Sequence, residues 1–282
     1  MSNFPSSWEI LRPKTWRNRG KLVGPRTPAA RYESGKSPAL LAIHGFGGTP
    51  REVDLLADVA QEFGLRVAAP LLPGHGTHVR DLGRTRFEDW VGAARAELDT
   101  LKREGDVIVL GLSLGACVAA RLAEDVPVKG LVLLANALWL QSPYPACCLA
   151  IIQHFPVPKS FFVPKLAPDI QDATKRAEHL GYDAQLVAAA VEVYRGGQET
   201  QRRLTEIKCP TLLIHGALDK VCPVANVERV IQRLGTKDVR QAILPNSGHI
   251  VTRDCDAELV AREFRTFLNE LVADGPQTAR VL

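Results

Sequence analysis

Short runs of apolar residues alternate along the chain with segments in which apolar side chains recur every three or four positions. The runs, such as PALLAI at 38–43, are apolar on both faces, which is typical of strands buried in a parallel sheet. They begin near residues 38, 65, 106, 129, 211 and 239. The segments between them have the spacing of amphipathic helices, the clearest at 53–63, 87–103, 114–124 and 256–272. This order predicts an α/β fold with a mostly parallel central sheet and helices on both faces.

The alternation stops at about Ala137 and resumes near Cys209. The intervening stretch is apolar and rich in proline, and it ends in a helical pattern at 183–195. Open α/β sheets bind ligands at the carboxyl edge of their strands, so we expect this block to form a small cap over that edge. The predicted organisation has three parts. A basic N-terminal arm covers residues 1–37, the core consists of residues 38–136 and 209–282, and a cap or lid insertion covers residues 137–208.

The segment Thr49-Pro50-Arg51-Glu52 has the residues of a helix start. Threonine is a good N-cap, proline fits the first helical position, and a glutamate three residues after the cap closes a capping box. We therefore predict that a helix begins at Pro50, with Thr49 and Glu52 capping it. Gly64 is expected to end this helix.

Positive charge is concentrated at the start of the chain. Residues 1–37 hold eight lysines or arginines and two glutamates, whereas the whole chain has a formal net charge of +4. Trp8 and Trp16 lie among these charges. We expect a solvated extension whose tryptophans pack on the domain; the alternative is weak contact with an anionic membrane surface, which basic and aromatic residues together favour. No nucleic-acid motif accompanies the charge, so nucleic acid is not an expected partner.

The remaining composition is that of a globular protein in a reducing compartment. No apolar run reaches the roughly 18 residues that span a bilayer, and the N-terminus lacks the apolar core of a secretory signal. A cytoplasmic location is therefore expected. The six cysteines lack the spacing of metal ligands, and no metal site is predicted. Cys117, Cys222 and Cys255 are expected to be small apolar fillers, with a reactive thiol at Cys222 as the alternative; Cys147 and Cys148 receive no role.

The sequence Gly111-Leu112-Ser113-Leu114-Gly115 lies where a buried strand meets a helix. A serine at such a sharp turn has its Oγ lifted above the sheet, and the neighbours at ±2 must be small because the helix folds back over the strand. The helix also presents backbone N–H groups and the positive end of its dipole near the serine. Ser113 is therefore the candidate nucleophile.

A serine hydroxyl needs a base to take its proton and a third group to orient that base. His249 follows the last predicted strand and is the best candidate among seven histidines; His44 and His215 are expected to be structural. Asp219 leaves the penultimate strand at the same sheet edge and is the candidate acid, although a loop aspartate before a helix is often an N-cap. The order Ser113, Asp219, His249 favours the catalytic interpretation.

Two backbone amides are candidates for an oxyanion hole. The N–H of Leu114 follows the nucleophile, and that of Phe46 lies in the glycine-rich loop after the first strand. His75, in the sequence PGHG, follows the carboxyl end of another strand and is a tentative substrate-binding residue.

The motifs HGFGGTP, PGHG, GLSLG, HGALDKVCP and SGHIVTRD resemble, in this order, the α/β-hydrolase superfamily and within it the bacterial carboxylesterases and monoacylglycerol lipases. They cover residues 38–136 and 209–272. The resemblance implies Ser113 as the nucleophile, His249 as the base and Asp219 as the acid that orients it. It also implies the backbone N–H groups of Phe46 and Leu114 as the oxyanion donors and places His75 near the pocket. The arm and most of the insertion have no counterpart, so specificity is not carried across.

The predicted function is hydrolysis of carboxylic esters through an acyl-enzyme, without a metal or organic cofactor. The expected substrate is a small-molecule ester of a short or medium acyl chain, or a monoacylglycerol. A thioesterase, an amidase or a C–C bond hydrolase with the same triad stays open, as does a non-catalytic ligand receptor on the same fold. Apolar residues between Cys147 and Val163 are expected either to cover an acyl chain or to seal the insertion to the body.

Overall fold

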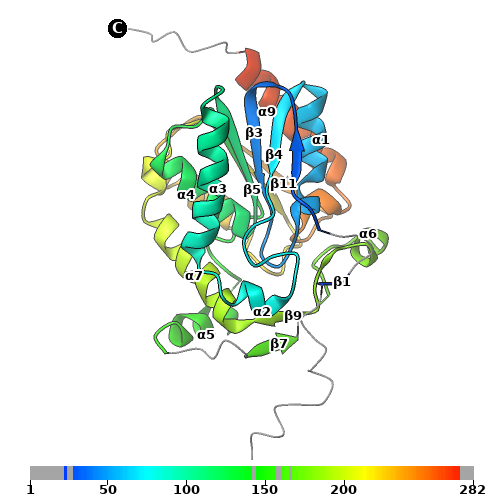
Figure 1. Cartoon of the computed structure of the whole chain (residues 1–282), viewed down its shortest axis with the longest axis vertical. Coiled ribbons are helices and arrows are strands. Elements are labelled where there is room, and N and C mark those ends of the chain that lie inside the picture. The colour runs from blue at the N-terminus through cyan, green and yellow to red at the C-terminus, as the bar shows by residue number, and fades with distance from the viewer. Residues whose placement is uncertain (1–21, 24–27, 142–143, 156–160, 165–166, 274–282) are drawn as a thin grey trace, which may run out of the picture.

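A computed structural model of the chain describes residues 22–23, 28–141, 144–155, 161–164 and 167–273 (Figure 1). The predictions for Trp8, Trp16 and the membrane contact of the arm lie outside the described residues. The interpretation of the arm therefore stays a prediction.

A seven-stranded sheet forms the centre of the molecule, with the strand order β11-β10-β6-β5-β3-β4-β2. Neighbouring strands run parallel, except that β2 is antiparallel to β4. The strands are β2 (Arg31–Glu33), β3 (Lys36–Ile43), β4 (Leu65–Ala69), β5 (Val107–Leu112), β6 (Gly130–Leu134), β10 (Thr211–Gly216) and β11 (Val239–Leu244). The predicted α/β fold with a mostly parallel sheet is confirmed.

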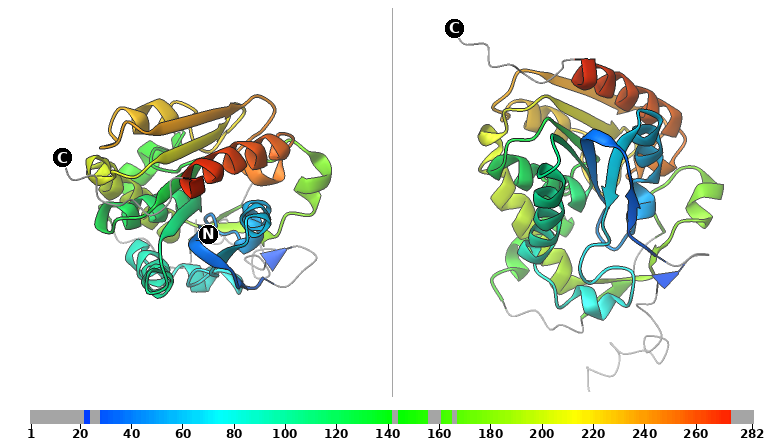
Figure 2. Two further views of the ribbon diagram at one scale, coloured as in Figure 1. Left: turned by 90° about the horizontal axis from the view of Figure 1, so that it is seen from above. Right: turned by 45° about the horizontal axis from the view of Figure 1, so that its top comes forward.

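Helices cover both faces of the sheet and create two cores (Figures 1 and 2). On one face lie α1 (Asp54–Glu62) and α9 (Ala257–Ala273), whose apolar sides pack on the strands around Phe264. On the other face lie α3 (Phe87–Lys102), α4 (Leu114–Asp125) and α8 (Asn226–Ile231). These helices hold the sheet rigid, so its carboxyl edge can present side chains at fixed positions.

The insertion lies at the end of the sheet where its parallel strands finish (Figure 1). Its elements are α5 (Tyr144–Ile152), β7 (Phe162–Pro164), α6 (Ala173–Ala177), β8 (Gly181–Tyr182), β9 (Ala184–Leu186) and α7 (Val187–Gln201). The hydroxyl of Tyr182 donates to the carbonyl of Gly74 at 3.1 Å, in the loop that follows β4. This bond joins the insertion to the carboxyl edge. The boundaries at 137 and 208 stay predictions.

The chain before residue 38 contributes to the sheet. Arg31–Glu33 form β2, the antiparallel edge strand, and β1 (Leu22–Val23) pairs with β8 of the insertion. An arm separate from the core up to residue 37 was expected. The sequence did not reveal this strand because only three residues, Arg31, Tyr32 and Glu33, pair at the edge, which is too few for their alternating burial to be recognised as a pattern.

The predicted helix start at Thr49 is wrong in its details. Pro50–Glu52 form a single 3₁₀ turn, α1 begins at Asp54, and the Thr49 side chain makes no capping bond. The reason is that the Glu52 carboxylate is used elsewhere, accepting the backbone N–H of Gly45 at 2.8 Å. The glutamate of the expected capping box here serves the glycine loop after β3 instead of the helix. Gly64, with φ +69°, follows the end of α1 as predicted.

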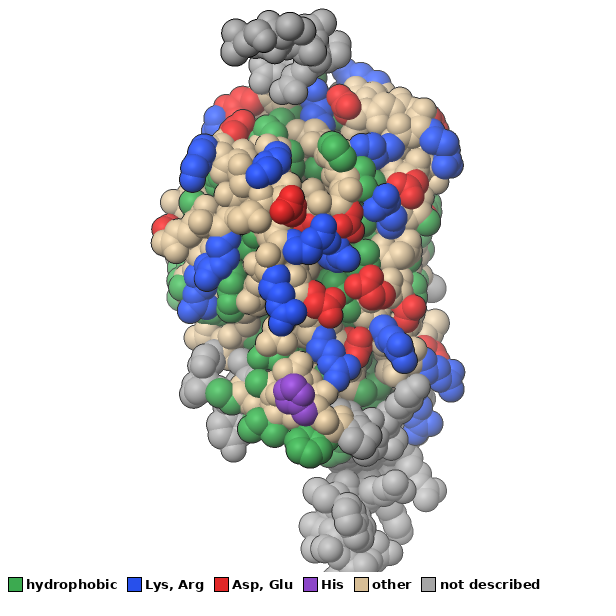
Figure 3. Space-filling view, turned by 90° about the vertical axis from the view of Figure 1, so that its left-hand side faces the viewer, with side chains coloured by type: hydrophobic (Ala, Val, Ile, Leu, Met, Phe, Trp, Pro, Cys, Tyr) green, Lys and Arg blue, Asp and Glu red, His purple; other side chains and the backbone are tan. Residues whose placement is uncertain are grey.

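Acidic and basic side chains are intermixed over the face that carries α3 and α4, with more hydrophobic side chains near the insertion (Figure 3). Among the described residues, no helix combines the length and the apolar character needed to cross a membrane.

Candidate active site

Ser113 lies in the turn between β5 and α4 with φ 57° and ψ −112°, a left-handed conformation that is uncommon for a residue with a Cβ. The turn is fixed by its neighbours. The Ser113 N–H donates to the carbonyl of Leu134 at 2.9 Å, and its carbonyl accepts from Ala116 at 3.1 Å and Ala137 at 3.3 Å. Backbone bonds to β6 and α4 thus hold the serine above the sheet.

The two glycines that flank this turn are required by close backbone contacts. A Cβ on Gly111 would lie 2.0 Å from the carbonyl oxygen of Gly115, and one on Gly115 would lie 2.1 Å from that of Ile43. Both separations are far below van der Waals contact. The prediction that small residues are needed on both sides of Ser113 is confirmed.

Ser113, His249 and Asp219 meet at the carboxyl edge of the sheet. The Ser113 Oγ lies 2.8 Å from His249 Nε2, and His249 Nδ1 lies 2.8 Å from Asp219 Oδ2. Because an ionised carboxylate only accepts, Nδ1 carries the proton and Nε2 is left to accept from the serine hydroxyl. The hydrogen bonds therefore run from serine through histidine to aspartate.

Both oxygens of the Asp219 carboxylate accept hydrogen bonds. Oδ1 accepts the backbone N–H groups of Val221 at 2.8 Å and Cys222 at 2.9 Å, while Oδ2 faces His249. His215 Nε2 lies 3.0 Å from the same Oδ2. Burial raises the pKa of Asp219, but the charge of His249 and the hydrogen bonds of both histidines outweigh it and lower the pKa well below its ordinary value. Asp219 is therefore an anion that both caps a turn and orients an imidazole.

The pKa of His249 is raised above its ordinary value of 6.5. Burial lowers it, but the Asp219 carboxylate raises it by charge and hydrogen bonding, and the charges of Asp169 and Glu52 add to this effect. The side chain is 10% exposed, so solvent screens these charges weakly. The environment stabilises an imidazolium, the form that arises when the histidine removes a proton.

The glycine-rich loop after β3 passes directly beside the start of α4. A Cβ on Gly115 would lie 2.7 Å from the His44 carbonyl oxygen, so the backbone just before Phe46 lies against the turn that carries Leu114. Two buried groups hold the loop. The Glu52 carboxylate accepts from Gly45 N–H, and His44 accepts the Leu72 N–H at its Nε2, 3.1 Å away. The loops of the two predicted amide donors therefore lie side by side.

His75 is buried among aromatic rings next to Phe46. Its ring lies edge-on to those of His44, Trp90 and Phe46, with centroid separations of 4.9, 5.9 and 6.4 Å. His75 thus lies beside the candidate oxyanion loop, as expected for a residue near the pocket, and its role in substrate binding stays a prediction.

Residues 36–256 match the family described as serine aminopeptidase, S33. The chain belongs to this family. It is an α/β-hydrolase, and the resemblance to bacterial carboxylesterases and monoacylglycerol lipases is confirmed by individual relatives.

Two curated relatives cover most of this hydrolase. The chain is 29% identical over 231 residues to the thermostable monoacylglycerol lipase of Bacillus sp. (strain H-257), covering 81% of this chain and 89% of the relative. It is 25% identical over 247 residues to the carboxylesterase of Bacillus subtilis (strain 168), covering 87% and 98%. A solved structure from work on LipS and LipT, two metagenome-derived lipolytic enzymes, superposes with a TM-score of 0.79 at 27% identity, over 88% of this chain and 100% of that one. The predicted class of carboxylic ester hydrolase agrees with these relatives.

Three charged or polar side chains of this hydrolase support the site in ways that the sequence did not predict: His215 was expected to be structural, Glu52 was expected to cap a helix, and Asp169 was given no role. His215 contacts Asp219, Asp169 of the insertion accepts from the backbone of both the Asp219 and His249 loops, and Glu52 braces the loop of Phe46. For His215 a signal was present, since it precedes Asp219 by four residues at the end of β10. Asp169 lies in a stretch with no recognisable pattern, so only the tertiary structure reveals it.

The cysteines of this hydrolase are all free, and two of them are buried near the site. Burial raises the pKa of Cys117 to about 12 and that of Cys222 well above its ordinary value, so both thiols stay protonated and pack as small apolar groups, as expected. Cys255 is exposed, so its prediction as a filler is wrong. Residues 254–256 form a short turn between the His249 loop and α9, which leaves this side chain on the surface.

Asp219, Cys222 and His249 are the one group among the described residues with ligand atoms close enough for a metal ion, all within 4.8 Å. In this hydrolase Asp219 and His249 already bond to each other, and a protonated thiol is a poor ligand. The group is explained by the hydrogen bonds of the site.

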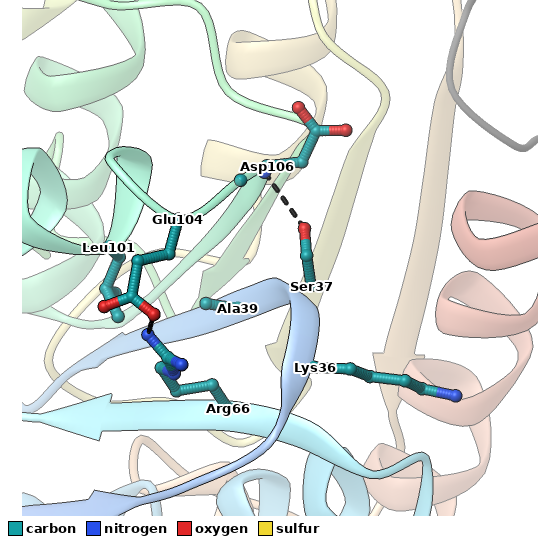
Figure 4. Close-up of a pocket in the computed structure, with 8 residues that line it drawn as sticks. Lys36, Ser37, Ala39, Arg66, Leu101, Glu104 and Asp106 are labelled. Atoms are coloured by element: carbon teal, nitrogen blue, oxygen red, sulfur yellow. Dashed lines mark hydrogen bonds and ion pairs between the residues drawn. The ribbon is translucent and has the colours of Figure 1, made fainter.

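A small hollow of about 20 Å³ lies at the opposite edge of the sheet, where β3, β4 and β5 begin (Figure 4). Arg66 and Glu104 form an ion pair across it, and Ser37 Oγ accepts the Asp106 N–H at 3.0 Å. These residues satisfy one another. The hollow has room for about one water molecule and is not a candidate substrate site.

Proposed function

We propose that the chain hydrolyses carboxylic esters with Ser113 as nucleophile, His249 as general base and Asp219 as the acid that orients the base. One observation carries the proposal. The hydrogen bonds from Ser113 Oγ to His249 Nε2 and from Nδ1 to Asp219 Oδ2 are both 2.8 Å long, on a serine raised above the carboxyl edge of the sheet. This is the geometry that lets a base accept a proton as the serine attacks.

The reaction follows from the position of each group. Ser113 Oγ attacks the ester carbonyl while its proton moves to His249 Nε2, and the Asp219 carboxylate stabilises the imidazolium. The tetrahedral intermediate collapses, His249 returns the proton to the leaving alkoxide, and an alcohol departs. A water molecule then attacks the acyl-enzyme with His249 again acting as base, which releases the acid and restores the Ser113 hydroxyl.

The negative charge of the tetrahedral intermediate is assigned to the backbone N–H groups of Phe46 and Leu114. Leu114 begins α4, so its N–H has no partner within the helix and the helix dipole adds to its effect. Glu52 and His44 fix the loop of Phe46 before substrate arrives. A donor that is held in advance costs no reorganisation during the reaction, and each one typically contributes about 10² to 10³ in rate.

The proposed substrate is an ester of a short or medium acyl chain, including monoacylglycerols. The names of the two curated relatives support this class. The insertion also exposes large apolar side chains, with Ile151 64%, Phe155 65% and Phe161 48% accessible. Of the two uses predicted for this segment, covering an acyl chain fits these exposures better than sealing the insertion to the body.

The test is a series of p-nitrophenyl esters from acetate to palmitate, with the wild-type chain and Ser113→Ala in parallel. We expect turnover with an optimum at short or medium chains, and a loss of kcat on the order of 10⁴ to 10⁶ in the variant. Matched thioester, amide and diketone substrates of the best acyl group distinguish an esterase from a thioesterase, an amidase and a C–C bond hydrolase. Ligand binding without turnover on any of them, by folded protein, would instead support the receptor.

A further inference from the structure

The segment Pro168–Asp172 of the insertion lies against the loops of the proposed triad. The backbone N–H groups of His249 and Ile250 both donate to the Asp169 carbonyl, at 3.0 and 3.3 Å. From the other side, the Asp254 carboxylate accepts from the N–H groups of Gln171 and Asp172, at 2.8 and 2.9 Å. The segment is therefore hydrogen-bonded to the loop that carries the base.

The side chain of Asp169 extends this contact to the loop of the orienting acid. Its Oδ2 accepts the N–H of Lys220 at 2.8 Å and that of His249 at 3.2 Å. Lys220 directly follows Asp219, so one carboxylate oxygen joins the backbone beside the acid to the backbone of the base. The contact needs a glycine at 248, because a Cβ there would lie 2.8 Å from Asp169 Oδ1.

We propose that Asp169 is a positioning residue through which the insertion sets the placement of His249 relative to Asp219 and stabilises the charge that His249 acquires. The proposal rests on the proposed function. It assigns to the insertion, which was expected to form a cap over the carboxyl edge of the sheet, a direct part in organising the base. The Asp169 carboxylate binds the backbone N–H groups of Lys220 and His249, and its charge acts on the His249 ring. Asp169 therefore acts through His249 and does not touch the reacting atoms.

The charge of Asp169 is one of several that face His249. Asp219 from the loop after β10 and Glu52 from the turn before α1 also raise the pKa of His249, while burial lowers it. Asp254 lies behind Gly248, accepting its N–H at 2.7 Å, and His215 faces Asp219. Removing the Asp169 charge leaves the other groups in place, so the pKa of His249 should fall.

The experiment compares Asp169→Asn with Asp172→Asn. Both variants remove one negative charge from the same segment. The Asp172 carboxylate, however, caps α6, accepting from Thr174 at 2.9 Å and Lys175 at 3.0 Å, whereas the Asp169 carboxylate accepts from the triad loops. For Asp169→Asn we expect a loss of kcat on the order of 10- to 100-fold, little change in KM, and an acid limb of the kcat/KM profile moved to lower pH. Asp172→Asn should keep the wild-type kcat and acid limb.

A wild-type kcat and an unmoved acid limb in folded Asp169→Asn would overturn the proposal, as would an equal shift of the limb in Asp172→Asn. If Asp169→Asn does not fold, Asp169→Glu replaces it. That variant keeps the charge but adds a methylene where Gly248 leaves no space, so kcat should fall with the acid limb unmoved, and a wild-type kcat would contradict the proposal.

A measurement that needs no substrate separates this inference from the proposed function. The titration of His249 can be followed by NMR of histidine-labelled protein, in the wild type and both Asn variants. A midpoint that falls in Asp169→Asn alone supports the placement of this charge even if no ester is hydrolysed. Equal midpoints in the three proteins would refute it even if esters are hydrolysed.

Discussion

Single residues of this hydrolase hold conformations and charges that the rest of the structure must support. Ser113 has a positive φ, which costs free energy of about 1 to 3 kcal/mol for a residue with a Cβ. Bonds of its own N–H and carbonyl to Leu134, Ala116 and Ala137 keep it there. Asp219 is buried as an anion, and its four partners offset the loss of hydration. The conformation of Ser113 and the buried charge of Asp219 are therefore stable only when the surrounding elements are folded.

Glu124 is a buried acid that the proposed reaction does not use. Its side chain is fully buried on α4, with Arg121 and Arg203 each 3.9 Å away. Burial raises its pKa from 4.5 to about 8, although both arginines oppose this effect. The pKa of this carboxyl is higher in the folded than in the unfolded state. The folded protein therefore loses stability as pH rises from about 4.5 to 8, by at most about 1.4 kcal/mol for each pH unit.

We therefore predict that Glu124→Gln stabilises the chain at alkaline pH. The difference in free energy of unfolding between variant and wild type should be small at pH 5 and should favour the variant by about 1 to 3 kcal/mol at pH 8.5. Urea unfolding at both pH values measures it. The control is Glu199→Gln, which removes an exposed carboxyl of α7 and should show no such dependence. The same difference for Glu124→Gln at pH 5 and pH 8.5 would contradict the account.

At the scale of elements, the turn from β5 to α4 depends on close packing against β3. The start of α4 lies so near the end of β3 that Gly115 has no room for a Cβ beside the Ile43 carbonyl. This contact brings the loop of Phe46 next to Leu114. The spacing of the proposed oxyanion donors is therefore set by the packing of α4 on β3.

Gly115→Ala should destabilise the chain by about 1 to 3 kcal/mol and lower kcat, because the added Cβ forces α4 away from β3. The matched control is Gly92→Ala in the middle of α3, where a Cβ would meet nothing within 4 Å. That change should stabilise the helix by about 0.5 to 1 kcal/mol and leave kcat unchanged. Urea midpoints and ester turnover measure both effects. A Gly115→Ala variant as stable and active as the wild type would show that the contact is not needed.

At the scale of the whole molecule, the sequence predicted the parallel sheet because its central strands are apolar on both faces. It also predicted that Ser113, Asp219 and His249 would meet, since each follows a parallel strand and such strands end at one edge. It did not predict β1 and β2, which are only two and three residues long and therefore too short for an alternating pattern to be recognised. These short strands form because β8 and β4 offer backbone hydrogen-bonding partners to them.

The roles of Glu52 and Asp169 were not predicted for the same physical reason. Glu52 has the position of a helix cap and Asp169 has no local pattern, yet each accepts a backbone N–H from another loop, that of Gly45 and that of Lys220. Hydrogen bonds of this kind depend on which loops meet in the folded chain. A local pattern can therefore locate the residues of the proposed triad, which have fixed places on the sheet, but not the residues that hold their loops.

Titration of the protein with a p-nitrophenyl phosphonate, which reacts covalently with an activated serine, tests whether Ser113 is the nucleophile. We expect release of one equivalent of p-nitrophenol per chain, with the phosphonate mass found on the peptide that contains Ser113. Folded Ser113→Ala should release none. No release from folded wild-type protein, or a phosphonate found on another residue, would contradict the assignment of Ser113 as the nucleophile.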